Sequence, residues 1–173
     1  MKQILVVLMM LAAVSAWAQA PATAAEGSVV SNFLFVGYTY AHTDFSPIIA
    51  DHNGGTAIYD RYLSPNFAVE AECSLVYGNI SFKGADYMGG ARLNIGIGKI
   101  TPYIHGLVGY GTTNFKGNAQ FPQNGMTTKV GAGVDYFLTQ RMGLRVAQVD
   151  WRRQYFGNGT DWIEISTGVF YTW

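Results

Sequence analysis

Apolar and polar residues alternate with a period of two through most of the chain from residue 33 onward. This period indicates β-strands with one apolar face, separated by turns that contain glycine or proline. Glycines recur inside most of these runs, which argues against long helices because each costs about 1 kcal/mol in a helix interior. The pattern predicts eight strands, at residues 33–41, 55–63, 67–77, 85–97, 101–113, 127–138, 142–154 and 161–173.

The predicted connections alternate between short and long. "SPN" at 64–66, "GKI" at 98–100 and "TQR" at 139–141 are tight turns. Up-and-down barrels of the bacterial outer membrane have this rhythm, with long loops outside the cell and short turns in the periplasm. The longer predicted connections are residues 42–55, 78–84, 116–126 and 156–160.

The charged residues of most strands fall on one face. In strand 67–77 the acids Glu70 and Glu72 share the even positions, and the odd positions are apolar or aromatic apart from Cys73. A soluble barrel would turn its charged face to water, but charge is too sparse here for a water-facing surface, so we expect the apolar face to meet lipid. The sequence therefore predicts an all-β, eight-stranded antiparallel up-and-down transmembrane β-barrel. A soluble ligand-binding barrel is the alternative.

Some positions break the alternation. Asp60 and Arg61 are adjacent, so one of them must point outward beside a short turn, where side chains reach the headgroups. In the seventh strand Arg145 has odd parity and Asp150 even parity, and Gln148 has the lipid-facing parity. We expect Asp150 near the outer rim, and a β-bulge would also shift the phase of this strand.

Composition supports a membrane location. Charged residues make up 13% of the chain, about half the usual ~25%, and aromatic residues reach 14%. Lys plus Arg and Asp plus Glu number 11 each, so no basic surface for nucleic acid is expected. The single cysteine, Cys73, cannot form an internal disulfide.

The first residues have the features of a secretory signal peptide. Lys2 precedes an apolar run at 4–14, and small residues follow it. The run is too short to span a bilayer, which needs about 20 residues. We expect a signal peptide at 1–18, with cleavage possibly as late as residue 20, then a flexible lead-in at 19–31 and the outer-membrane barrel at 32–173.

The last strand carries apolar or aromatic residues at every second position. Pairing with the first strand would close the barrel and remove its edges, and Trp173 would lie in the aromatic girdle at the membrane interface. The strand resembles the sorting signal of outer-membrane barrels, although the usual final residue there is Phe. The residues expected to carry barrel assembly are Ile165, Val169, Tyr171 and Trp173.

Four segments extend this resemblance: "FLFVGYTYAH", "TPYIHGLVGYG", "KVGAGVDYFLTQRMGLRVAQVDW" and "IEISTGVFYTW". They resemble small outer-membrane β-barrel proteins of the opacity-porin type, which are related in architecture to the membrane domain of the outer-membrane protein A family. The resemblance implies export through the periplasm and insertion by the outer-membrane barrel assembly machinery. It concerns fold and location more than activity.

Strand parity predicts a polar network inside the barrel. An eight-stranded barrel is just wide enough for its side chains to fill it, and opposite charges would pair there through charge-assisted hydrogen bonds. We expect a structural plug, with a gated ion path as the alternative. The predicted inward charges are Glu70, Glu72, Arg92, Lys129, Asp135, Arg145 and Glu164.

The three histidines give little support for catalysis or metal binding. His42 and His52 lie in the first predicted loop near acids and a serine, a mixture common in polar loops, and His105 is alone in mid-strand. No paired ligand spacing indicates a metal site. We expect no catalytic site, metal or cofactor, and keep an outer-membrane lipid-modifying enzyme as an alternative.

Together these patterns predict a monomeric bacterial outer-membrane barrel with a structural or surface-interaction role. Its expected partners are the outer-membrane lipids and, during biogenesis, the assembly machinery. A small ion or solute channel is the first alternative.

Overall fold

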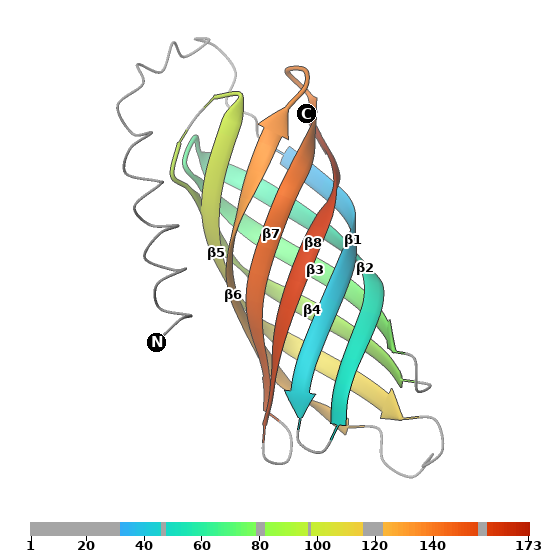
Figure 1. Cartoon of the computed structure of the whole chain (residues 1–173). Coiled ribbons are helices and arrows are strands. Elements are labelled where there is room, and N and C mark those ends of the chain that lie inside the picture. Colours follow the sequence, from blue (N-terminus) through green and yellow to red (C-terminus); the bar gives the residue numbers. More distant parts are fainter. Residues whose placement is uncertain (1–31, 46–47, 79–81, 97, 116–122, 156–158) are drawn as a thin grey trace, which may run out of the picture.

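The computed structural model describes residues 32–45, 48–78, 82–96, 98–115, 123–155 and 159–173. The predicted signal peptide at 1–18 and lead-in at 19–31 lie outside these residues. In the described part the chain forms a closed barrel in which every strand is antiparallel to its neighbours and β8 pairs with β1 (Figure 1). The strands are β1 (Asn32–Phe45), β2 (Ile48–Ser64), β3 (Phe67–Gly78), β4 (Phe82–Asn94), β5 (Ile100–Phe115), β6 (Gln123–Phe137), β7 (Met142–Tyr155) and β8 (Thr160–Thr172). The predicted fold class is confirmed.

The barrel has two distinct ends. We call the end that holds the turns after β2, β4 and β6 the short-turn end, and the opposite one the far end. Asn32 and Trp173 lie together at the short-turn end, where the backbone N–H of each donates to the carbonyl of the other at 3.1 and 3.2 Å. These two bonds close the barrel where its first and last strands meet.

The first hairpin differs from the prediction. Residues 42–55 were expected to form a long loop, but β1 continues to Phe45 and β2 begins at Ile48. Backbone pairing persists there, with His42 opposite Asp51 and Thr43 opposite Ala50. The Tyr40 hydroxyl and His42 Nδ1 both contact the Asp51 carboxylate across the two strands. The polar, glycine-containing sequence of this stretch is typical of a loop and did not indicate the extension.

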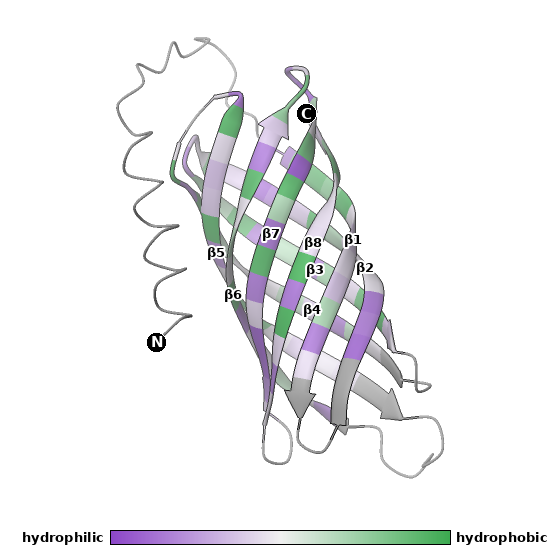
Figure 2. Ribbon diagram, viewed as in Figure 1, coloured by the Kyte–Doolittle hydropathy of each residue, from purple (hydrophilic) through white to green (hydrophobic). Residues whose placement is uncertain are grey.

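The outer wall is apolar. Large side chains such as Val36, Val108, Val130 and Val169 are about half exposed, and outward positions alternate with buried ones along the strands. Many of the buried side chains are polar, so hydrophobic and hydrophilic residues mix along each ribbon (Figure 2). Exposing such a wall to water would be unfavourable, because each Å² of apolar surface that stays in water loses about 25 cal/mol of stabilisation. The barrel is therefore a transmembrane one with its apolar face toward hydrocarbon. None of the described residues forms a helix long and apolar enough to cross a membrane.

The interior is arranged in layers. Near the short-turn end the rings of Phe33, Phe35 and Phe170 form a fully buried aromatic layer, which Ile58 completes. The ring of Phe35 occupies the space beside Gly37, where a side chain would collide with it. Toward the far end a smaller apolar layer contains Ala41, Val76 and Trp162. The charged side chains lie largely between these two layers.

A β-bulge in β7 explains the irregular parity of that strand. Between Arg145 and Gln148 the pairing with β8 shifts, so that Arg145 opposes Gly168 and Gln148 opposes Ser166. Both Val146 and Ala147 face outward as a result, and Gln148 and Asp150 turn inward. Gln148 is thus not lipid-facing, and the expectation that Asp150 lies at the outer rim is wrong, because its side chain is 1% exposed inside the barrel.

Candidate functional site: the polar lumen

All seven charged residues predicted to point inward lie in the barrel interior. Every one is almost completely shielded from solvent, with exposed fractions of 0 to 3%. Their backbones come from β3, β4, β6, β7 and β8, so the network joins most of the barrel wall. The seven are Glu70, Glu72, Arg92, Lys129, Asp135, Arg145 and Glu164.

One cluster lies beside the aromatic layer at the short-turn end. Arg92 donates from Nη2 to Asp135 at 2.6 Å and from Nη1 to Asp60 at 3.2 Å. Arg145 donates from Nε to the other Asp135 oxygen at 2.9 Å. Asp135 therefore accepts from two guanidinium groups that reach it from β4 and β7, and both of its oxygens are used.

The same two arginines lie over aromatic rings. The Arg92 guanidinium carbon is 3.8 Å from the centre of the Tyr103 ring, and that of Arg145 is 4.3 Å from the Phe35 ring. Cation–π attraction is stronger when the cation is desolvated, reaching about 2 kcal/mol or more. The aromatic layer and the ionic cluster thus form one packed unit.

A second cluster lies nearer the far end. Lys129 forms ion pairs with Glu72 at 2.5 Å and with Glu164 at 2.7 Å. Arg152 bridges Glu164 at 2.6 Å and Asp86 at 2.5 Å. These contacts link strands on opposite sides of the barrel.

His105 joins the two clusters. Its Nδ1 is 2.7 Å from Glu70 and its Nε2 is 2.8 Å from Asp150. With a carboxylate oxygen at each ring nitrogen, both nitrogens donate only when the ring is an imidazolium. Gln148 continues the chain of contacts, since its Nε2 donates to Asp150 at 2.6 Å and its Oε1 accepts from Tyr103 at 2.6 Å.

Two glycines of β6 leave room for the side chains around His105. A Cβ atom on Gly131 would overlap the Asp150 carboxylate, so the absence of a side chain there lets Asp150 reach His105. Tyr103 occupies the space beside Gly133 in the same way.

Parity missed several members of the network. Asp86 shares the parity of Arg92 on β4, and His105 shares that of Tyr103 on β5, so each could have been found from its strand neighbours. For the adjacent pair Asp60 and Arg61, parity indicated only that one side chain points inward, and the structure shows that it is Asp60. Asp150 and Arg152 were harder to place, because the change of parity after Arg145 indicates a bulge but does not fix where it lies or which side chains it turns inward. The buried charged side chains number seven acids and four Lys or Arg among the described residues, rather than the four and three expected.

The other histidines have different surroundings. His42 lies on the outer wall at the far end, where its Nδ1 is 2.8 Å from Asp51 and the Tyr40 hydroxyl donates to the same oxygen at 2.6 Å. Counted along β2 from the short-turn end, Asp51 lies beyond the 9–11 residues that a strand needs to cross the bilayer. The hydrogen bond from Tyr40, followed by the contact with His42, holds the pKa of the Asp51 carboxyl below its usual range. His52 points inward beside the Trp162 ring, with ring centres 4.8 Å apart.

The charged side chains of the lumen contact one another in the part of the chain that the structure describes. No group of three His, Cys, Asp and Glu side chains is placed to hold a metal ion among the described residues. The nitrogens of His105 are both directed at carboxylates, not at a hydroxyl. The geometry can hold charge and bind strands together.

The outward positions of β8 form part of the lipid-facing wall. All four residues expected to carry assembly are exposed on this face, with exposed fractions of 41 to 55%. The rings of Tyr171 and Trp173 stack 5.9 Å apart at the short-turn end. The four are Ile165, Val169, Tyr171 and Trp173.

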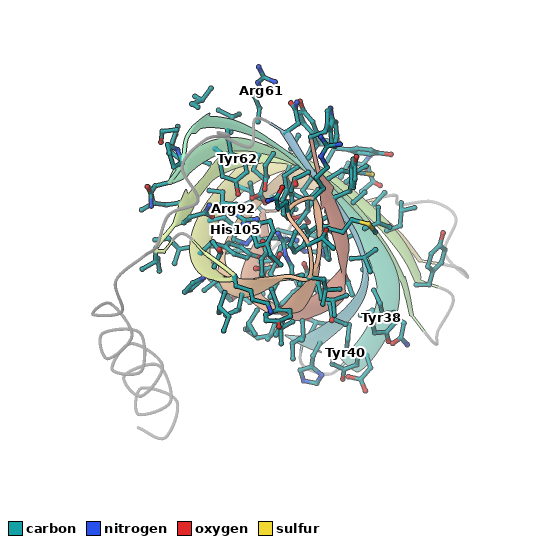
Figure 3. The ribbon with its side chains drawn as sticks, turned by 90° about the horizontal axis from the view of Figure 1, so that it is seen from above. Tyr38, Tyr40, Arg61, Tyr62, Arg92 and His105 are labelled. Carbon is teal, nitrogen blue, oxygen red and sulfur yellow. The ribbon has the colours of Figure 1, made fainter. Side chains whose placement is uncertain are left out.

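Figure 3 views the barrel along its length. Arg92, His105 and Tyr62 lie within the ring of strands, whereas Tyr38, Tyr40 and Arg61 project from its outer side. The view agrees with the burial of Arg92 and His105, the partial burial of Tyr62 and the exposure of Tyr38 and Arg61.

No family model matches the sequence, and no curated protein matches it. Solved structures do match in fold. Neisserial surface protein A (NspA) is 16% identical, covers 86% of this chain and 100% of its own, and has a TM-score of 0.68. Ail, the attachment invasion locus protein of Yersinia pestis, is 12% identical, with coverages of 82% and 97% and a TM-score of 0.61.

A third match is the N-terminal β-barrel domain of Pseudomonas aeruginosa OprF. It is 16% identical, covers 83% of this chain and 98% of its own, and has a TM-score of 0.59. Identities this low carry the fold and not the activity. The chain has the fold of the small eight-stranded outer-membrane β-barrels.

Proposed function

We propose that this protein is a bacterial outer-membrane barrel whose lumen is closed by its own ion pairs, and that it has a structural or surface-interaction role without catalysis. The observation that carries the proposal is the continuous set of contacts from Arg92 through Asp135, Arg145, Gln148 and Asp150 to His105. Side chains that bind each other across the lumen occupy the space that a solute would need.

Planar-bilayer recordings of the reconstituted protein test the plug. We expect no conductance above the leak of the protein-free bilayer, because most of the charged side chains in the middle of the lumen are held by two or more partners, as Asp135, Lys129 and Arg152 are. Reproducible single-channel steps would contradict the plug and favour the small-channel alternative.

The surface role concerns the far end, which we propose lies outside the cell because it carries the longer connections. Ail is described in complex with the heparin analogue sucrose octasulfate. Among the described side chains at this end of the present chain, the exposed acids Asp51 and Asp161 accompany Arg153. The sequence adds Asp44, Lys83 and Lys116 to the same end, so acids and bases balance there and charge does not favour a polyanionic partner.

Export, assembly and monomeric state complete the proposal. We propose cleavage after residue 18, or as late as residue 20, and insertion by the assembly machinery guided by β8. The intact mass of protein purified from outer membranes would give the cleavage site directly. Light scattering of the detergent complex should give one chain per particle.

A further inference from the structure

Three rows of outward side chains cross β2, β1 and β8 at the short-turn end. In the first row Arg61 opposes Asn32, which in turn bonds Trp173 through the backbone. The second row is aromatic at both sides and the third is small or aliphatic throughout. From the end of the barrel inward, the rows are Arg61, Asn32 and Trp173; Tyr59, Leu34 and Tyr171; and Ala57, Val36 and Val169.

Asn32 holds the polar part of this surface in place. Its Oδ1 accepts from Arg61 Nη1 at 2.7 Å and from the Tyr59 hydroxyl at 2.8 Å. A guanidinium has five N–H donors in a planar fork, and the contact with Asn32 uses one of them. Arg61 is exposed, it takes part in no ion pair with the described residues, and it projects away from the barrel in Figure 3.

Aromatic rings lie in the row of Arg61 and in the next row toward the middle of the barrel. Tyr59 and Trp173 have ring centres 6.4 Å apart, and Tyr171 stacks on Trp173 at 5.9 Å. We call Asn32, Tyr59, Arg61, Tyr171 and Trp173 the rim platform. The order from cation and amide through aromatic rings to aliphatic side chains is the order of polarity in a phospholipid, from phosphate through glycerol to acyl chain.

The exposed charged side chains described at this end are all basic. The exposed cations Arg61, Lys99 and Arg141 lie on it, whereas the exposed acids among the described side chains, Asp51 and Asp161, lie at the far end. Arginine binds phosphate in two-pronged geometry and is less strongly hydrated than an ammonium group. The field at the rim therefore favours an anionic headgroup.

We propose that the rim platform binds the phosphate of an anionic glycerophospholipid in the leaflet on the short-turn side. Arg61 receives the phosphate, Asn32 orients the guanidinium, and the Tyr59, Tyr171 and Trp173 rings contact the glycerol and upper acyl chains. This site rests on the transmembrane placement of the proposed function, and it deepens that proposal by naming a lipid partner.

Native mass spectrometry of the folded full chain in detergent tests the site, with phosphatidylglycerol as the probe and phosphatidylcholine as the neutral comparison. We expect preferential retention of phosphatidylglycerol. Arg61→Gln should lower its apparent affinity about five-fold, the effect of one surface cation on an anionic lipid, and Arg61→Lys should lower it less.

The matched control is Arg153→Gln, the same chemical change on a partly exposed arginine at the far end, whose ion pair with Asp161 is long. Equal loss in both variants, or no loss in Arg61→Gln, would overturn the site. Displacement of the lipid by inorganic phosphate would also overturn it in favour of a soluble anion. Heat-modifiable migration of each variant on a gel reports insertion separately, and Arg61→Lys carries the comparison if Arg61→Gln does not fold.

Discussion

At the scale of single residues, the stability of the barrel depends on which partners each buried charge has. Arg92 contacts Asp60, Asp135 and Asn94, and its guanidinium lies over Tyr103. Removing one partner from such a set leaves an uncompensated charge in a dry site, which is far more costly than never having had the pair. Exposed pairs carry little energy because water and salt screen them.

We therefore predict that Arg92→Gln lowers the free energy of unfolding by about 3–5 kcal/mol. Arg153→Gln should change it by less than about 1 kcal/mol, since its pair with Asp161 is long at 3.8 Å and both side chains are substantially exposed. Urea titration of the protein folded in lipid vesicles measures both. Similar losses for the two arginines would mean that the lumen network does not stabilise the barrel.

At the scale of elements, β7 shows how one extra residue changes a whole face. Asp135 of β6 opposes Arg145, and Val134 opposes Ala147. Val146 therefore has no paired residue on β6. A bulge of this kind re-aims the side chains that follow it. It brings Gln148, Asp150 and Arg152 into the lumen and keeps Arg145 there as well.

We predict that deleting Val146 yields an assembled barrel. Without this residue the strand alternates regularly, so Arg145 and Gln148 still point inward and Ala147 still points outward. Deleting Ile165 from β8, where no bulge can absorb the change, should prevent assembly, since a one-residue slip moves the following side chains to the opposite face. The fraction of heat-modifiable protein after refolding into detergent compares them. Equal yields would contradict the role assigned to the bulge.

At the scale of the whole molecule, the barrel reverses the arrangement of a soluble one. Its ion pairs fill the inside, and Val36, Val108, Val130 and Val169 face outward. Stability then depends on depth in the membrane, since a charge on the lipid side is most costly at the midplane and is tolerated near the headgroups.

We predict that Val130→Arg, in the middle of β6, destabilises the barrel by about 2–4 kcal/mol, whereas Leu138→Arg at the short-turn end costs about 0–1 kcal/mol. Both side chains are more than half exposed on the outer wall, at 51% and 57%, so the comparison isolates depth from burial. Equilibrium unfolding in vesicles is the measurement. Equal costs would indicate that the outer wall does not contact hydrocarbon.

The amino-acid sequence alone was sufficient for the strand number, their antiparallel order and the outward direction of the apolar face. Those properties follow from local alternation and from turns that each involve a few neighbouring residues, as in β3, where every second residue is buried. The same reasoning placed Glu70, Arg92 and Glu164 inside. It failed for the extent of the first hairpin, where backbone pairing continues through a polar, turn-like stretch.

Only the tertiary structure decided which charges meet. Glu70 and Asp150 are 80 residues apart by number, yet they share the two nitrogens of His105 because barrel closure brings β3, β5 and β7 around one axis. The bulge at Arg145–Gln148 likewise depends on pairing with β6 and β8 on both sides. Alternation is a property of one strand, whereas the choice of partner is a property of the closed sheet, and no single strand contains it.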